Sequence, residues 1–144
     1  MQHTIPLSKL KAQIGPQLDE MVAAVEACVH CGFCNATCPT YQLLGDELDG
    51  PRGRIYLMKQ MFEGGEVTEA TQTHLDRCLT CRNCETTCPS GVQYHNLLDI
   101  GRDFMEQQVP RSAGERLLRT GLSLDEVRRR EDLRMGELDA RSPR

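Results

Sequence analysis

Two cysteine runs with identical spacing constrain this chain more than any other feature. Each run reads C-x2-C-x2-C-x3-C-P, and the second run begins 50 residues after the first in the same register. Together the runs contain all eight cysteines of the chain, which are Cys28, Cys31, Cys34, Cys38, Cys78, Cys81, Cys84 and Cys88. No cysteine lies outside the two runs, so any role for the cysteines has to account for both runs.

The spacing indicates iron-sulfur chemistry. Thiolates at positions i, i+3 and i+6 of a tightly turning loop can reach three corners of a cubane cluster, while the proline after the fourth cysteine directs the chain away in an extended conformation. In two-cluster ferredoxins this fourth cysteine binds the other cluster. The rule predicts one [4Fe-4S] cluster on Cys28, Cys31, Cys34 and Cys88, and a second on Cys78, Cys81, Cys84 and Cys38.

Zinc and disulfides are the competing uses of these cysteines. Structural zinc favours two separated pairs of ligands, which leaves Cys34 and Cys84 without a role. Regularly spaced cysteines in a reducing compartment are ligands more often than disulfides. The clusters therefore rank above both, and because each cluster draws ligands from both runs, we expect the metal-free chain to be largely unfolded.

Composition narrows the class of protein. The chain has 144 residues, 4% aromatic residues and no tryptophan, so its apolar core is limited and metal centres would add stability. A net charge of −4 argues against a nucleic-acid partner. Apolar stretches are far shorter than the roughly 18 residues of a membrane span, and the first residues lack the apolar region of a secretory signal. We therefore expect a cytoplasmic protein.

The chain reads as an all-α protein with three parts. These are an N-terminal arm over 1–16, a helical two-cluster domain over 17–110 and a charged, partly disordered C-terminal extension over 111–144, where nine arginines stand among seven acidic residues. Apolar spacing, proline and glycine positions and a candidate N-cap predict helices over 17–28, 51–63, 68–78 and 97–108, with a short helical turn within 41–48.

Several charged side chains have open interpretations. Arg82 and Asn83 stand in the second run where the first has glycine and phenylalanine, so Arg82 either raises the potential of the second cluster or points into water. Arg52 and Arg54 either grip a partner carboxylate, lie near a cluster, or are solvated at the start of a helix.

No site for substrate chemistry is recognisable, so no catalytic residue is predicted. The sequence has no phosphate-binding loop, no nucleotide fingerprint and no nucleophile with an evident base. Cysteine fills every coordination position of the predicted clusters, which leaves electron transfer as their role. Histidines His30, His74 and His95 are interpreted as ordinary surface or backbone-bonded residues.

Five segments resemble the amino-terminal ferredoxin region of the iron-sulfur subunit of bacterial glycolate oxidase, and the resemblance extends over about 22–118. The cysteine runs alone are shared with helical ferredoxin modules of the lactate-utilisation, anaerobic glycerol-3-phosphate dehydrogenase and heterodisulfide reductase families. Two of the segments, 45–55 and 94–99, favour the glycolate oxidase subunit over these other families. The five segments are 27–34, 38–41, 45–55, 78–84 and 94–99.

The resemblance implies an α-helical ferredoxin fold and a non-catalytic subunit of a glycolate dehydrogenase complex. Such a subunit takes electrons from FAD-containing dehydrogenase subunits and passes them to a quinone or another carrier through other parts of the complex, at the inner face of the membrane. Alternatives are a free-standing ferredoxin, or the iron-sulfur subunit of a lactate, glycerol-3-phosphate or heterodisulfide reductase type complex. Family members continue into a long carboxy-terminal region with Cys-Cys-Gly motifs, whereas this chain has no cysteine after Cys88. We therefore expect a truncated form, a gene fragment or a free-standing short version of that subunit.

Overall fold

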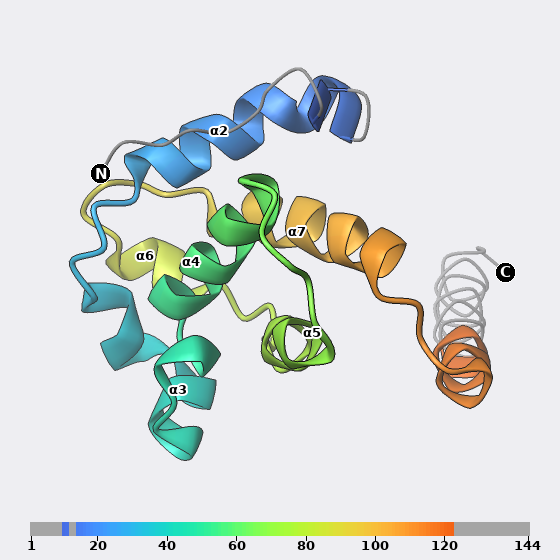
Figure 1. Cartoon of the computed structure of the whole chain (residues 1–144). Coiled ribbons are helices and arrows are strands. Elements are labelled where there is room, and N and C mark those ends of the chain that lie inside the picture. The colour runs from blue at the N-terminus through green and yellow to red at the C-terminus, as the bar shows by residue number, and fades with distance from the viewer. Residues whose placement is uncertain (1–9, 12–13, 123–144) are drawn as a thin grey trace, which may run out of the picture. The chain divides into compact units, whose positions relative to one another are not determined.

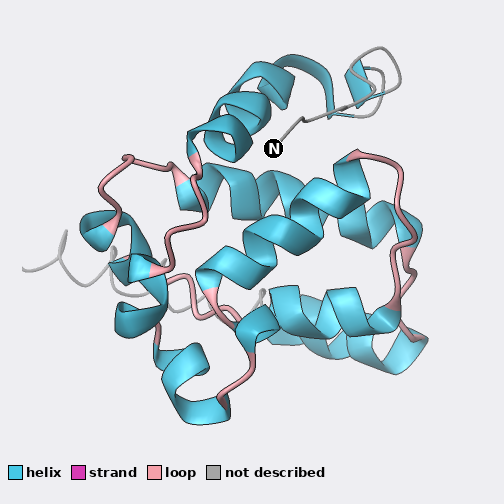
Figure 2. Cartoon of the chain, turned by 60° about the vertical axis from the view of Figure 1, so that its left-hand side comes forward, coloured by secondary structure: helices cyan, strands magenta, loops and turns pink. Residues whose placement is uncertain are grey.

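The computed structural model describes residues 10–11 and 14–122, and regular structure in this part of the chain is entirely helical (Figure 2). The all-α prediction is therefore confirmed. The elements of the first compact unit are η1 (Gly15–Gln17), α2 (Leu18–Ala27), η2 (Phe33–Thr37), α3 (Pro39–Leu44), η3 (Glu47–Asp49), α4 (Pro51–Phe62), α5 (Glu69–Asp76), α6 (Asn83–Thr87) and α7 (Tyr94–Gln108).

The chain divides into two compact units, Met1–Val109 and Pro110–Arg144. In the second unit the described residues include a helix over 113–122. The predicted boundaries at 16 and 110 stay predictions, and most of the arm and of the charged extension lies outside the described residues. Leu10, within the predicted arm, is buried in the core of the first unit.

Helix α7 is the centre of the first unit. Helices α2, α4 and α5 all pack against it (Figure 1). Phe104 of α7 meets Phe62 of α4 edge to face, with ring centroids 5.5 Å apart, a geometry that aromatic pairs prefer. Side chains from all four helices fill the space between them, and the most deeply buried are Met21, Val25, Met58, Phe62, Leu75, Leu97, Leu98 and Met105.

The helix ends follow the signals in the sequence. Thr68 caps α5, because its hydroxyl accepts a hydrogen bond from the Thr71 amide. Pro51 opens α4, which ends two residues before Gly64, a glycine in the left-handed region at φ +89°. Helix α7 begins three residues earlier than predicted, at Tyr94, and ends two residues before Pro110. Local residue chemistry thus determines where these helices begin and end.

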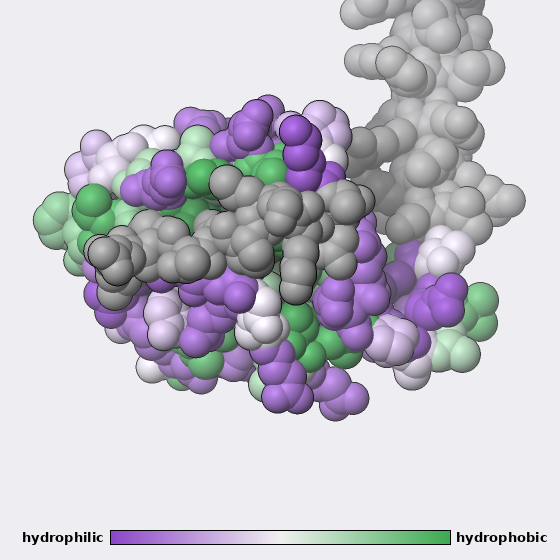
Figure 3. Space-filling model, turned by 45° about the horizontal axis from the view of Figure 1, so that its top comes forward, coloured by the Kyte–Doolittle hydropathy of each residue, from purple (hydrophilic) through white to green (hydrophobic). Residues whose placement is uncertain are grey.

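The outer surface of the first unit is mixed in character. The face seen in Figure 3 carries hydrophilic side chains with smaller hydrophobic groups between them. None of the described helices is both long and apolar enough to cross a membrane.

Gly53 allows α4 to approach η3 closely. A Cβ atom built on Gly53 would lie 2.7 Å from the carbonyl carbon of Glu47 and 2.8 Å from the Cα atom of Leu48. Backbone atoms cannot turn aside as a flexible side chain can, so any side chain here would push the two elements apart.

We predict that Gly53→Ala destabilises the cluster-loaded protein by about 1–3 kcal/mol, because it overpacks this contact. Thermal and denaturant unfolding measure the change. Gly121→Ala is the matched control, since a Cβ atom at Gly121 meets nothing within 4 Å and alanine favours a helix over glycine. Equal stability of the two variants would contradict the packing argument.

Candidate metal centres

The two cysteine runs fold into the same loop. His30 and Gly32 in the first run, and Thr80 and Arg82 in the second, all have left-handed φ angles, of 55°, 86°, 53° and 62°. Residues other than glycine adopt this region rarely. Its recurrence at matched positions indicates that the cysteine spacing sets the loop shape, which turns the first three thiols of each run to one side.

A short helix follows the loop in each run, and these two helices were not predicted from the sequence. They are η2 and α6, and they lie against each other. At their ends the Thr87 hydroxyl donates to the Thr37 hydroxyl oxygen over 3.3 Å, and the Thr37 hydroxyl lies 3.4 Å from the Asn83 carbonyl oxygen. Each Thr-Cys-Pro sequence therefore sits beside the other run.

Two cavities lined by thiols result from this contact. The first has a volume of about 30 Å³ and the second about 250 Å³. Pro51, Cys84 and Tyr94 line both cavities and form a shared wall. The first cavity also contains Cys28, Cys31, Cys34 and Cys88, and the second contains Cys38, Cys78 and Cys81.

The donor set fits [4Fe-4S] clusters, which are held by four cysteine thiolates each. None of the eight cysteines forms a disulfide, so all eight are available as ligands. Burial, followed by the neighbouring Cys28, raises the pKa of Cys34 to about 11, and burial, followed by Cys78, raises the pKa of Cys84 to about 12. Without metal these thiols keep their protons at neutral pH, so metal coordination is what makes them thiolates.

Residues of α7 hold the second run in place. Arg102 donates from Nη2 to the carbonyl oxygens of Leu75 at 2.8 Å and Cys78 at 2.9 Å. The Tyr94 hydroxyl lies 3.7 Å from the Cys78 sulfur. Arg102 thereby ties the end of α5 and the first cysteine of the run to the central helix.

Glu85 ties the same run to the first turn of α7. Its Oε1 atom accepts hydrogen bonds from the His95 amide and from His95 Nδ1, both at 2.7 Å. The pKa of Glu85 is lowered overall: burial raises it, but the hydrogen bonds from His95 outweigh that effect. A carboxylate in this place suits the positive end of the helix dipole.

The three arginines with open interpretations differ in their surroundings. Arg82 is 57% exposed and pairs with Glu85 at 2.9 Å, which agrees with the solvated alternative. Arg52 is 37% exposed and pairs with Glu47 at 2.6 Å. Arg52 also lies close over Gly32, where an added Cβ atom would be 2.9 Å from Nη1. Solvation at the helix start is wrong for Arg54, which is fully buried.

Asp49 is the buried partner of Arg54, and the sequence did not single it out. Its Oδ1 atom lies 3.6 Å from Arg54 Nη2 and 3.0 Å from His74 Nδ1, while Oδ2 lies 3.0 Å from Arg77 Nη1. Burial raises the pKa of Asp49, but the hydrogen bonds from His74 and Arg77 outweigh burial and lower it overall. His74 therefore has a specific partner rather than the ordinary surface role that we expected.

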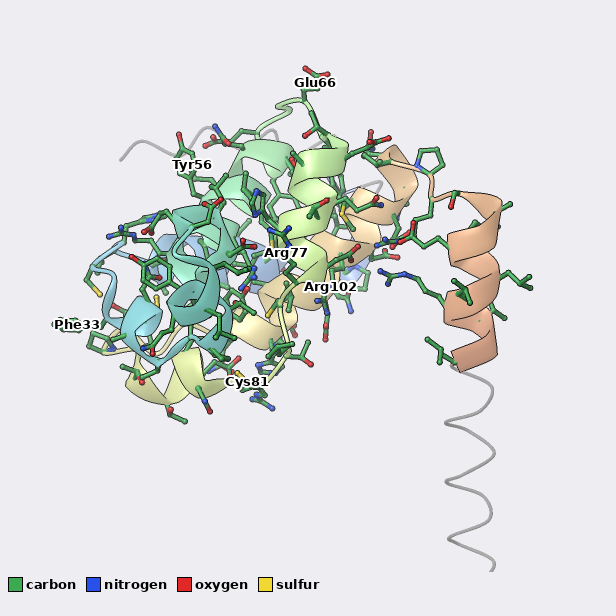
Figure 4. The ribbon with its side chains drawn as sticks, turned by 90° about the horizontal axis from the view of Figure 1, so that it is seen from below. Phe33, Tyr56, Glu66, Arg77, Cys81 and Arg102 are labelled. Carbon is green, nitrogen blue, oxygen red and sulfur yellow. The ribbon has the colours of Figure 1, made fainter. Side chains whose placement is uncertain are left out.

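Exposed residues of the two cysteine runs lie at different edges of the domain (Figure 4). Phe33 points outward at one edge of the domain and Cys81 lies at another. Phe33 and Cys81 are both exposed, as is Cys31 in the first run. Each thiol set thus has a side that a partner protein can approach.

Comparison with known proteins agrees with this chemistry. Residues 24–92 match the family model of the 4Fe-4S dicluster domain. The chain is 77% identical over 103 residues to the glycolate oxidase iron-sulfur subunit of Escherichia coli (strain K12). These aligned residues make up 72% of this chain and 25% of that protein. The chain is 48% identical over 94 residues to the probable glycolate oxidase iron-sulfur subunit of Bacillus subtilis (strain 168), covering 64% of this chain and 21% of that protein.

A more distant similarity reaches other oxidoreductases. The chain is 34% identical over 74 residues to the succinate dehydrogenase iron-sulfur subunit of Paracoccus denitrificans, covering 45% of this chain and 28% of that protein. No solved structure matches the chain. The chain spans about a quarter of the length of each of these three relatives. The match of residues 24–92 to a 4Fe-4S dicluster domain indicates two [4Fe-4S] clusters and electron transfer, and the predicted resemblance to glycolate oxidase iron-sulfur subunits is confirmed.

Proposed function

We propose that this chain relays electrons within a flavin-dependent glycolate dehydrogenase complex. It receives them from FAD-containing subunits and passes them towards a quinone or another carrier held by other parts of the complex. The observation that carries the proposal is the pair of thiol-lined cavities with a shared wall, in a chain 77% identical over 103 residues to a glycolate oxidase iron-sulfur subunit.

The chemistry of the donor suits such a relay. Oxidation of glycolate to glyoxylate releases two electrons and two protons, and the flavin accepts both electrons together. Each bound [4Fe-4S] cluster supplies a one-electron redox centre. Two such centres can carry the electrons away from the flavin one at a time, and the fact that Cys84 lines both cavities supports their lying close together.

We also propose the crosswise ligand assignment. Cys28, Cys31, Cys34 and Cys88 hold one cluster, and Cys78, Cys81, Cys84 and Cys38 hold the other. In support, Cys88 lines the first cavity with the first run, and Cys38 lines the second cavity with the second run. Cys88 is also among the groups that raise the pKa of Cys28, after burial.

The exposed edges support separate places for electron entry and exit. Phe33 beside the first cavity and Cys81 beside the second lie at different edges of the domain (Figure 4). We propose that the chain acts in the cytoplasm, at the inner face of the membrane when the complex uses a quinone. Cysteines that serve as ligands rather than as disulfides suit that reducing compartment.

Anaerobic mixing of the cluster-loaded chain with FAD-containing subunits of a glycolate-oxidising enzyme tests the function. We expect glycolate to bleach the visible absorption of the clusters and to produce an EPR signal. A chain whose clusters accept electrons from dithionite, but not from these subunits with glycolate, would instead be a ferredoxin for another donor.

Paired cysteine substitutions test the ligand assignment. Combining Cys31→Ala with Cys88→Ala removes two ligands of one cluster, so about half of the iron should remain. Combining Cys31→Ala with Cys38→Ala removes one ligand from each cluster, so both should be lost or damaged. Iron analysis and EPR distinguish the two variants, and the reverse pattern would establish that each run binds its own cluster.

Removal of iron tests whether the clusters hold the two runs together. We expect a strong chelator under reducing conditions to unfold most of the chain, because the ligands of each cluster come from both runs. Circular dichroism measures the loss of helix, and reconstitution with iron and sulfide should restore it. A metal-free chain that keeps the holoprotein's spectrum and melting temperature would contradict this expectation.

A further inference from the structure

We propose that Arg54 sets the reduction potential of the cluster held by the second cavity, and makes that cluster the more easily reduced of the two. This inference rests on the proposed function, because it requires both cavities to hold redox-active clusters. Asp49 acts with Arg54 by fixing its position.

Arg54 is a buried cation next to a predicted ligand. Its side chain is 1% exposed, and its Nη1 atom lies 4.0 Å from the Cys38 sulfur. Arg54 lines the second cavity together with Cys38. It belongs to the buried side of α4, along with Ile55 and Met58.

Hydrogen bonds hold the guanidinium in this place. Nε donates to the His74 carbonyl oxygen at 2.7 Å, and Nη1 donates to the Thr40 hydroxyl at 3.1 Å. The Thr40 hydroxyl in turn donates to the Asp49 carbonyl oxygen at 2.8 Å and lies 3.2 Å from the Cys38 sulfur. Elements α3, η3, α4 and α5 therefore all fix the position of one positive charge.

Asp49 compensates this charge only in part. The single carboxylate of Asp49 faces the guanidinium of Arg54 at 3.6 Å and that of Arg77 at 3.0 Å. One negative charge between two positive charges leaves a positive excess. Because Arg77 is 47% exposed, water screens its charge, and Arg54 and Asp49 remain as a weakly screened buried pair. Arg54 lines the second cavity and Asp49 does not, so the positive member of this pair faces the cavity.

The first cavity has a different arrangement. Arg52 lines that cavity from the same turn of α4, but it is 37% exposed and pairs with Glu47 at 2.6 Å. At the second cavity Arg82 is likewise exposed and paired, with Glu85. Each cavity therefore has its own arginine from α4. The charge of Arg54 beside the second cavity is buried, whereas the charge of Arg52 beside the first is screened by water and by Glu47.

Reduction adds one negative charge to a cluster, and a nearby cation stabilises the reduced form. Nearby charge and hydrogen bonds to the sulfurs are among the main factors that tune such potentials. Arg54 provides a cation in a weakly screened place, so the second cluster should hold the electron at equilibrium.

Redox titration of the two-cluster protein, followed by EPR, tests the inference. In Arg54→Gln we expect the ratio of reduced to oxidised second cluster at a fixed potential to fall at least tenfold, which is about 59 mV for a one-electron couple. Cys81→Ser identifies the signal of that cluster, since Cys81 lines the second cavity alone. Arg52→Gln is the matched control and should leave the second cluster unchanged.

Two further variants separate charge from loss of packing. Asp49→Asn removes the compensating negative charge and should raise the same ratio, opposite to Arg54→Gln, whereas general loosening has no reason to reverse sign. Arg54→Lys keeps the charge and should retain a potential closer to the original than Arg54→Gln does. If Arg54→Gln fails to fold, the direction of the Asp49→Asn shift decides.

The outcomes distinguish this inference from the proposed function. An unchanged second-cluster potential in Arg54→Gln, or an unchanged or lower one in Asp49→Asn, overturns the inference and leaves electron relay intact. An original protein without two reducible clusters overturns the proposed function itself. A fall with Arg54→Gln together with a rise with Asp49→Asn establishes the role of Arg54.

Discussion

The contact between the two Thr-Cys-Pro sequences is the interaction on which the rest of the site depends. The hydroxyls of Thr37 and Thr87 meet there, and this brings the fourth cysteine of each run to the cavity of the other run. Neither run can build a complete thiol set by itself in this geometry. The site therefore forms only when both runs are folded against each other. The helices α2 and α5, which precede the two runs, must end close together for this to happen.

Much of this architecture could be predicted from local residue chemistry. Thr68, Pro51 and the glycines after α4 determine helix ends through backbone geometry, which acts over a few residues. The cysteine spacing predicts cluster chemistry because cubane geometry demands it. The short helices η2 and α6 were not predicted, because each has only five residues and shows too little apolar periodicity to indicate a helix.

The network of Asp49, Arg54 and His74 could not be predicted in the same way. Its members come from separate elements and meet only when η3, α4 and α5 pack together. One signal was present: Arg54 stands four residues before Met58, on the buried side of α4, where most residues are apolar. A cation at such a position implies a buried anionic partner, although the sequence does not identify which acidic residue it is.

The contact of Arg52 with Gly32 makes the two halves of an internally repeated site non-equivalent. The loops share one backbone shape, yet the Arg52 guanidinium covers the glycine of the first loop, while the second loop carries Arg82 at the matching position. A copy of the second run could not replace the first without displacing Arg52 from its cavity. The two halves of the repeat are therefore not interchangeable, and the first three thiols of each run lie in different surroundings.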